Sequence, residues 1–186
     1  MRVAAVALSL VAVCGCHRSP FANPKTSNLV DQLQDGEPKV RLTAATALGK
    51  LGAGAKDAVP ALTERLKDDN QFVRIAAAGA LASVGPDARD AVPALTIALK
   101  DSHGAVRVAC ANALGRLGPT AKAAVPALTD ALGDKLSFVR EAAARALGEI
   151  GAAAWDALPA LKQATKDDEE SVRTAAAQAA RRIEAR

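Results

Sequence analysis

The sequence predicts an all-α fold, an array of stacked helix pairs, and three observations favour it. Ala supplies 46 of the 186 residues, and Ala is the strongest helix former. Tyr is absent, and three Phe and one Trp are too few aromatic residues for the pleated faces of a β-sandwich. From Leu29 onward the chain repeats with a period of 33 residues, which is the mark of a stacked repeat array.

Residues 1–15 have the features of an export signal. Arg2 gives the positive start, and the 11 residues from Val3 to Val13 form an apolar run with one Ser. A run of this length suits a signal peptide and is too short for a membrane-spanning helix, which takes about 17–25 residues. We therefore expect an exported protein.

The residues that follow, Val13-Cys14-Gly15-Cys16, resemble a bacterial lipobox. The resemblance implies cleavage before Cys16, a diacylglyceryl group on its sulfur, and anchoring on the extracytoplasmic side, periplasmic or at the cell surface. Residues 16–28 would then be the lipidated Cys and a tether. An ordinary secreted protein and an uncleaved anchor are the alternatives. Cys110 would remain as the one free thiol, so we expect no disulfide framework.

Five copies of one unit fill residues 29–186 without insertion or deletion. They are 29–61, 62–94, 95–127, 128–160 and a truncated 161–186. The first predicted helix of a unit begins near a Val-Pro-Ala-Leu motif such as Val59–Leu62, where Pro is tolerated in the first turn. Three aspartates stand three residues before such a Pro and are predicted N-caps: Asp57, Asp90 and Asp156.

The second predicted helix of a unit runs from Phe72 to Val84 in the second copy. Its residues Val73, Ala77 and Leu81 recur at helical spacing and predict one buried stripe. A Gly follows each complete second helix as a predicted C-cap, and a short loop begins there. These glycines are Gly52, Gly85, Gly118 and Gly151.

Two polar residues recur in all five copies. An Asp follows each first helix at the turn, and an Arg comes six residues later, in the first turn of the second helix. The planar fork of an Arg suits carboxylates and free turn carbonyls. The ten residues are Asp35, Arg41, Asp68, Arg74, Asp101, Arg107, Asp134, Arg140, Asp167 and Arg173.

The pattern of Asp, then Val-Arg, then Ala-Ala-x-Ala-Leu-Gly and a later Val-Pro-Ala-Leu resembles HEAT repeats, in the short variety called PBS-lyase HEAT-like. The resemblance covers residues 29–186. It implies an α-solenoid, a right-handed superhelix of five stacked two-helix repeats with the second helices on the concave side. It also implies that the recurrent Asp and Arg residues form a ladder between neighbouring repeats.

The last copy departs from the pattern. Thr165 and Ala180 replace leucines, and Arg181 and Arg182 stand where small or single charged residues stood. We interpret this copy as a polar terminal cap, which a solenoid needs for solubility.

The composition offers little for catalysis. Two His and three Cys are too few for a multi-ligand metal cluster. A net charge of +4 from interspersed residues does not indicate a nucleic-acid-binding surface.

Individual candidate residues also have non-catalytic explanations. The triad residue types in Asp101-Ser102-His103 are consecutive and cannot converge. Cys110 suits a small buried helix position, and the acidic run 167–170 suits a helix N-terminus. We expect no enzyme, cofactor, metal or nucleic-acid partner.

The candidate binding surface lies on the second helices, at positions offset by two from the buried stripe. These positions vary between copies, and the first copies place apolar residues there. Trp155, at a position where other copies have Lys or Arg, either anchors a partner or covers the adjacent loop. The candidates are Leu42, Phe72, Ile75, Val108, Asn112, Arg116, Phe138, Glu141, Arg145 and Trp155. The alternative is that the apolar ones only cover the contacts between repeats.

The sequence thus predicts a membrane-anchored, non-catalytic scaffold of the bacterial cell envelope that binds a protein or peptide. The same resemblance leaves a bilin lyase-like enzyme subunit as an alternative, because these repeats also occur in bilin lyases. A purely structural envelope protein is the other alternative.

Overall fold

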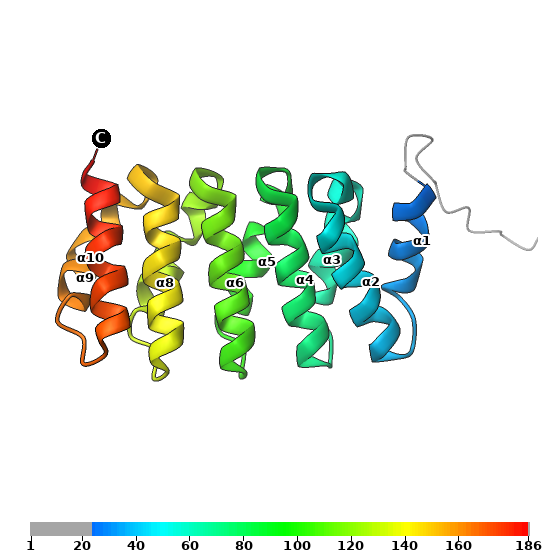
Figure 1. The fold of residues 1–186 in the computed structure, drawn as a ribbon, viewed down its shortest axis with the longest axis horizontal. Coiled ribbons are helices and arrows are strands. Elements are labelled where there is room, and N and C mark those ends of the chain that lie inside the picture. Colours follow the sequence, from blue (N-terminus) through cyan, green and yellow to red (C-terminus); the bar gives the residue numbers. More distant parts are fainter. Residues whose placement is uncertain (1–23, 186) are drawn as a thin grey trace, which may run out of the picture.

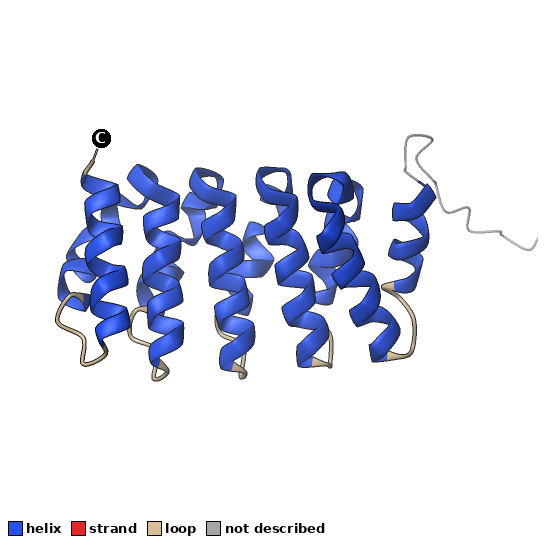
Figure 2. Cartoon of the chain, in the orientation of Figure 1, coloured by secondary structure: helices blue, strands red, loops and turns tan. Residues whose placement is uncertain are grey.

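The computed structural model describes residues 24–185, which form ten α-helices and four 3-10 helices without a strand (Figure 2). The elements are α1 (Pro24–Gln32), α2 (Pro38–Leu51), η1 (Gly52–Ala58), α3 (Val59–Arg65), α4 (Gln71–Val84), η2 (Gly85–Ala91), α5 (Val92–Ala98), α6 (Gly104–Leu117), η3 (Gly118–Ala124), α7 (Val125–Ala131), α8 (Ser137–Ile150), η4 (Gly151–Ala157), α9 (Leu158–Ala164) and α10 (Glu170–Glu184). The predicted signal peptide and Cys16 lie outside the described residues.

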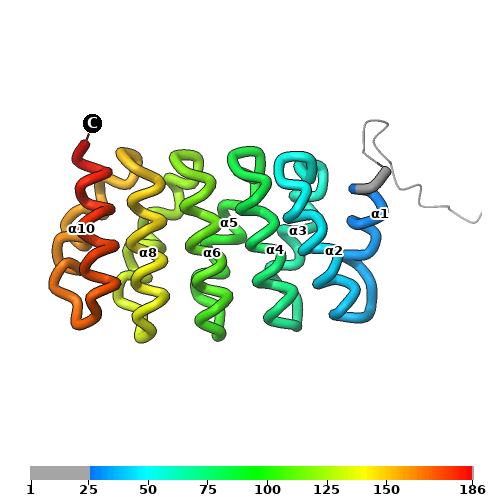
Figure 3. The backbone as a smooth tube through the Cα atoms, viewed as in Figure 1, coloured from blue at the N-terminus to red at the C-terminus, as the bar shows by residue number. Residues whose placement is uncertain are grey.

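The helices form two layers in one elongated array. The second helices α2, α4, α6, α8 and α10 stand side by side in one layer. The first helices α3, α5 and α9 lie behind them, and α1 stands at the end of the array beside α2 (Figure 1). The tube in Figure 3 follows this order from α1 at one end to α10 at the other. The predicted all-α solenoid of stacked two-helix repeats is therefore confirmed.

The second helices start after different residues, but the first four end at a recurrent Gly. In α4 the side chain of Asn70 accepts the backbone N–H of Phe72 at 2.9 Å, which satisfies one free donor of the first turn. The helix ends at Gly85 with φ of 76°, in a region that residues with a Cβ rarely adopt. Gly52, Gly118 and Gly151 end α2, α6 and α8 with positive φ as well, so the predicted C-cap glycines are confirmed.

The segments after these glycines are not the loops that the sequence suggests. Each consists of 3-10 turns on the two sides of a kink, and the second turn runs directly into the next first helix, as η1 runs into α3 after the kink at Ala55. The predicted N-caps Asp57, Asp90 and Asp156 are therefore wrong, since they lie inside η1, η2 and η4 and no side chain caps α3, α5 or α9. The physical reason is continuity: in η1 the N–H of Val59 already bonds to the carbonyl of Lys56, which leaves no open helix start to cap.

Small residues let the second helices approach closely. The stripe of α4 is buried as predicted, with Val73, Ala77 and Leu81 at most 1% exposed. A Cβ added to Gly148 in α8 would come within 2.8 Å of the Cα of Ala179 in α10. Backbone contact of this kind is why an Ala-rich and Gly-containing sequence can fill the core with few large side chains.

The two ends of the array differ from the interior. Helix α1 begins at Pro24, inside the segment 16–28 that the sequence assigns to the tether, and Pro suits a first helical turn. Leu33 after this helix is fully buried. At the other end Ile183 is buried while Arg181 and Arg182 are exposed, which gives α10 the polar outer side that a terminal repeat needs.

Candidate functional site

The recurrent Arg and Asp residues meet across the contacts between consecutive repeats. Arg41 of α2 donates from Nε to Asp68 Oδ2 at 2.7 Å and from Nη2 to Asp68 Oδ1 at 2.8 Å. Its third nitrogen, Nη1, donates to the backbone carbonyls of Asp35 and Gly36 at 2.8 and 2.9 Å. One guanidinium therefore joins the turn of its own repeat to the turn of the next.

The same arrangement recurs at every contact between repeats. The Arg of each repeat pairs with the Asp 27 residues later. We call these pairs the ladder: Arg41–Asp68, Arg74–Asp101, Arg107–Asp134 and Arg140–Asp167. Each of these Arg residues also bonds through Nη1 to the carbonyl of the Asp six residues earlier, at 2.7 to 2.9 Å.

The aspartates are fixed by their own turns. Oδ1 of Asp68 accepts the backbone N–H of Asn70 at 3.0 Å, and the other four aspartates accept the N–H two residues later in the same way. The carboxylate is thus oriented by its own repeat before the Arg of the preceding repeat reaches it. An oriented carboxylate and a planar fork give a bidentate pair of defined geometry.

This environment lowers the pKa of the paired aspartates. Burial raises the pKa of Asp68, but hydrogen bonds from the Arg41 guanidinium and the Asn70 N–H outweigh burial, so its pKa lies below its usual value. The same balance holds for Asp101 and Asp134. For Asp167 the hydrogen bond from Arg140 is the largest influence and lowers the pKa. The ladder therefore holds charged carboxylates.

The ladder arginines are substantially buried. The exposed fraction of the side chain is 11% for Arg41, 10% for Arg74, 8% for Arg107 and 16% for Arg140. Within residues 24–185, Asp35 and Arg173 take part in no Arg–Asp pair between repeats. Arg173 bonds instead to the carbonyls of Asp167 and Asp168, both at 2.8 Å.

The second helices present three rows of side chains on their outer layer, which we call the second-helix face. The positions of Asn112 and of Arg116 are exposed in all five repeats, whereas the position of Val108 is half-buried in the first four. The three rows are Leu42, Ile75, Val108, Glu141 and Thr174; Thr46, Gly79, Asn112, Arg145 and Gln178; and Lys50, Ser83, Arg116, Glu149 and Arg182.

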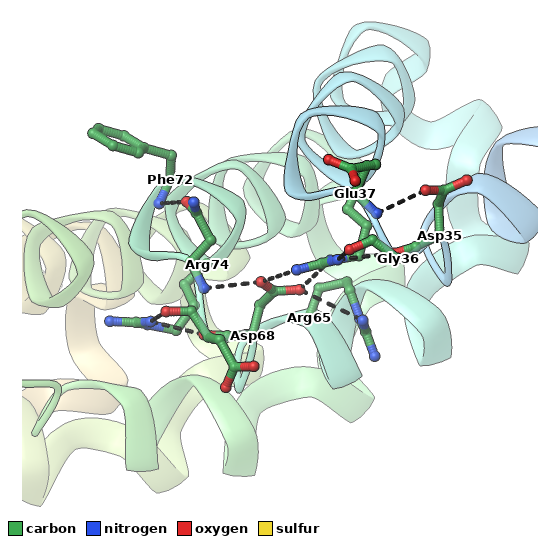
Figure 4. Close-up of polar contacts among 10 residues, drawn as sticks. Asp35, Gly36, Glu37, Arg65, Asp68, Phe72 and Arg74 are labelled. Atoms are coloured by element: carbon green, nitrogen blue, oxygen red, sulfur yellow. Dashed lines mark hydrogen bonds and ion pairs between the residues drawn. The ribbon is translucent and has the colours of Figure 1, made fainter.

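The apolar candidates on this face divide into two kinds. Phe72 and Phe138 are 58% and 50% exposed, and Figure 4 shows Phe72 pointing away from the ladder. Ile75 and Val108 are half-buried and pack against the core. A Cβ on Gly104 would lie 3.1 Å from the ring of Phe138, so this Phe partly covers the contact between α6 and α8. Both sequence interpretations, a binding surface and a cover for the contacts between repeats, thus have support on this face.

The charged candidates contact their own helix or the preceding second helix. Arg145 pairs with Glu141 one turn earlier on α8, and Nε of Arg116 donates to the carbonyl of Ala82 at 3.4 Å. Asn112 of α6 is exposed. A shallow depression of about 470 Å³ lies beside Glu141 and Arg145, where α8 faces α10.

Trp155 does not lie on a second helix. Trp155 is 48% exposed in η4, beyond the C-terminal end of α8, whereas Phe138 lies in the first turn of that helix. Sequence reasoning also missed Ile97 of α5, which is 68% exposed on the other layer. Glu64, Asp130 and Gln163 occupy the same position in other repeats, so a comparison of the copies would have revealed it.

The remaining residues that the sequence analysis considered for catalysis or metal binding lie in the ladder, next to it or in the core. Asp101 is a ladder residue, and His103 Nδ1 lies 3.2 Å from Arg74 Nη2. Cys110 is fully buried, and burial raises the pKa of its thiol to about 12. Within residues 24–185 no group of three His, Cys, Asp or Glu side chains is placed to hold a metal ion. In the same range, no helix has the length and apolar character needed to cross a bilayer.

Solved structures similar to this chain include a lyase complex, an engineered protein and designed repeat proteins. The complex of CpcE and CpcF of phycocyanin lyase from Nostoc sp. matches with 30% identity and a TM-score of 0.75, over 95% of this chain and 70% of that one. An engineered protein matches with 25% identity and a TM-score of 0.68, over 86% and 79%. Computationally designed armadillo repeat proteins for modular peptide recognition match at 22% identity and 0.67, over 85% and 82%.

No curated protein matches the chain in sequence. The family model for HEAT repeats, in contrast, matches residues 26–104 and 92–181. These two ranges cover nearly all of the described chain and include every pair of the ladder. The chain therefore belongs to the HEAT-repeat family.

Proposed function

We propose that this chain is a membrane-anchored, non-catalytic scaffold of the bacterial cell envelope that binds a protein or peptide on the second-helix face. One observation carries the proposal: this face changes from repeat to repeat, while the ladder at the turns before the second helices is constant. It is apolar around Phe72 and Ile75 and carries charge at Glu141 and Arg145. A surface that the stack does not dictate is free to match a partner, and an exposed apolar patch commonly marks an interaction site.

The anchoring part of the proposal rests on the lipobox-like residues that end at Cys16. Two or three acyl chains on one Cys hold a protein firmly on a membrane, because each buried CH₂ contributes about 0.8 kcal/mol. The predicted partner is therefore a protein or peptide that is accessible at the membrane surface outside the cytoplasm.

The test is site-specific photo-crosslinking in intact membranes. A photoreactive residue at Asn112 lies on the second-helix face, and one at Asp130 on α7 is a control that is equally exposed on the other layer. We expect a discrete adduct, identified by mass spectrometry, from position 112 only. Equal adducts from both positions contradict the proposed face, and no adduct from either favours a purely structural envelope protein.

Two variants refine the test. Phe72→Ser with Ile75→Asp removes the apolar centre and should abolish the adduct from position 112. Because Ile75 is half-buried, Phe72→Ser with Phe138→Ser provides a second variant in which only exposed rings change. As the control, Ile97→Ser removes an apolar side chain from α5 that is more exposed than either Phe, and it should leave the adduct intact. Retention of the adduct in both Phe variants counts against the face.

The similarity to the CpcE and CpcF complex favours a second candidate, a lyase-like subunit. That structure is a complex of two proteins of a phycocyanin lyase, so this candidate predicts a protein partner and a bound bilin. A purified chain mixed with a free bilin and passed through a gel-filtration column distinguishes the two candidates. Retention of bilin absorbance on the chain supports the lyase-like role, and its loss supports the scaffold.

A further inference from the structure

Open pockets recur along the edge of the array where the first helices end. Their volumes are about 420 Å³ between α3 and α5, 450 Å³ between α5 and α7, and 570 Å³ between α7 and α9. Each is lined by the Leu after one first helix, by two Ala of the next first helix and by a ladder pair. In the last pocket these residues are Leu132, Ala160, Ala164, Arg140 and Asp167.

At the contact between the first two repeats, a long side chain occupies the corresponding position. Arg65 of α3 occupies the repeat position that Ala98, Ala131 and Ala164 hold in the later repeats. Its Nη1 lies 3.5 Å from Oδ2 of Asp68 (Figure 4). Asp68 thus holds two guanidinium groups, that of Arg41 from the preceding repeat and that of Arg65 from its own.

The difference shows in the exposure of the ladder aspartates. Where Arg65 covers it, 1% of the Asp68 side chain is exposed. Where an Ala takes that place, 13% of Asp101, 14% of Asp134 and 12% of Asp167 is exposed. The small Ala side chain therefore leaves each later carboxylate within reach of a group from outside.

Charge distinguishes the last pocket from the other two. Its charged lining residues are three Asp, one Arg and one Lys. The pocket between α3 and α5 has two Asp, one Arg and two Lys, and the pocket between α5 and α7 has three Asp, one Arg and two Lys, so of these three only the last pocket has more acidic than basic residues. Gly133 stands where the earlier repeats have Lys67 and Lys100, and Asp168 adds a further carboxylate. The last pocket is thus the one most suited to a cation.

We propose that the pocket between α7 and α9 binds an arginine side chain of a partner polypeptide, in the place that Arg65 takes at the first contact between repeats. Leu132, Ala160 and Ala164 form an apolar wall for the carbon stem, and Asp167 and Asp168 accept from the guanidinium. Arginine fits better than lysine because its planar fork presents several donors to neighbouring carboxylates. This site is separate from the second-helix face and does not depend on the function proposed for that face.

The test uses N-acetyl-arginine amide as the probe, titrated into the purified chain and followed by NMR. We expect saturable shifts of the Gly133 and Asp168 amide signals. N-acetyl-citrulline amide has nearly the same shape without the charge. Its affinity should be lower by at least about tenfold, which corresponds to about 1.4 kcal/mol of binding free energy. Equal binding of the two probes, or no saturable shift with the arginine probe, overturns the proposal.

Variants that fill the pocket between α7 and α9, or that create a new pocket beside Asp68, give the structural control. Ala164→Arg should fill the pocket from within, as Arg65 does at Asp68, and remove probe binding. Ala152→Arg adds the same charge at an exposed position of η4, outside the pocket, and should bind the probe normally. Arg65→Ala should create a second site with shifts at the Asp68 amide. Unchanged binding by Ala164→Arg, or no second site in Arg65→Ala, contradicts the proposal.

A third variant covers the case in which Ala164→Arg disturbs the fold. Asp168→Asn keeps the shape of an exposed side chain and removes one carboxylate from the pocket. We expect it to weaken probe binding several-fold while NMR signals from α2 and α4 stay unchanged. Wild-type affinity in this variant contradicts a role for Asp168 and, with it, the choice of the last pocket.

Discussion

Arg107 binds both carboxylate oxygens of Asp134, with Nε 2.8 Å from Oδ2 and Nη2 2.8 Å from Oδ1. Its Nη1 bonds at the same time to the carbonyl of Asp101, also at 2.8 Å. This one side chain joins the turns of two consecutive repeats, and the ladder repeats the arrangement along the array. The predictions below begin from it.

Loss of a ladder arginine should destabilise the fold strongly. Arg107→Ala leaves Asp134 charged and largely buried without its partner, which typically costs about 3–5 kcal/mol. Arg116→Ala, on the exposed second-helix face, should change stability by only about 0.5 kcal/mol. Thermal unfolding followed by circular dichroism compares the two variants. Equal melting temperatures mean that the ladder contributes nothing beyond the apolar stack.

Acid should weaken the array in a defined direction. The pKa values of Asp68, Asp101, Asp134 and Asp167 are lowered in the folded chain, so the ladder's contribution is fully present above about pH 4, the ordinary range of an Asp. It is lost as the pH falls through the lower folded-state values. We expect a nearly constant melting temperature between about pH 7 and 5 and a fall at lower pH.

An Asp134→Asn variant is the control for this pH dependence. It lacks one ladder carboxylate at every pH, so its melting temperature should be lower than that of the natural chain at neutral pH. The difference should narrow in acid, where the natural carboxylate also becomes protonated. A difference that stays constant down to the lowest pH counts against the ladder as the source of the acid sensitivity.

Glycines in the second helices should respond oppositely to the same substitution. Gly148→Ala places a Cβ within 2.8 Å of the Cα of Ala179, and overpacking of this kind costs about 1–3 kcal/mol. Around Gly79 an added Cβ meets nothing within 4 Å, so Gly79→Ala should stabilise α4 by about 0.5–1 kcal/mol. Urea unfolding of both variants measures the two effects, and effects of the same sign contradict the close packing of α8 on α10.

The membrane anchor is tested by replacing the lipidated sulfur. Cys16→Ser should move the protein from the membrane to the soluble fraction and remove any lipid mass from its N-terminal peptide. Cys14→Ser is the matched control, because that residue is expected to leave with the signal peptide, and this variant should remain on the membrane. Membrane retention of Cys16→Ser, with no lipid found on the natural chain, refutes the lipoprotein assignment.

Much of the ladder could be predicted from spacing, but the identity of each partner could not. The sequence shows an Asp and an Arg six residues apart in every copy, which suggests contacts within one repeat as readily as between repeats. The structure shows both: Arg74 bonds to the carbonyl of Asp68 within its repeat and to the carboxylate of Asp101 in the next. The choice depends on how far one helix pair is displaced from its neighbour, and no local pattern encodes that displacement.

The helix boundaries also divide into those that the sequence predicts and those that depend on the tertiary structure. Proline in the first turn and glycine with positive φ are local constraints, so the start of α3 and the end of α4 follow from the sequence. The 3-10 helix η1 does not, because it forms between two helices whose ends are already fixed in space. The expected cap at Asp57 was wrong for that reason.

The sequence by itself determined the all-α class, the register of the repeats, the buried stripe and the residues of the ladder, because a 33-residue period imposes the same local conformation and the same packing on every copy. Only the tertiary structure decided which Asp each Arg binds, and that Ala164 leaves a pocket open where Arg65 covers Asp68. These features depend on side chains from different repeats meeting in space. The distance between such side chains is set by the stacking of whole helices, not by their separation along the chain.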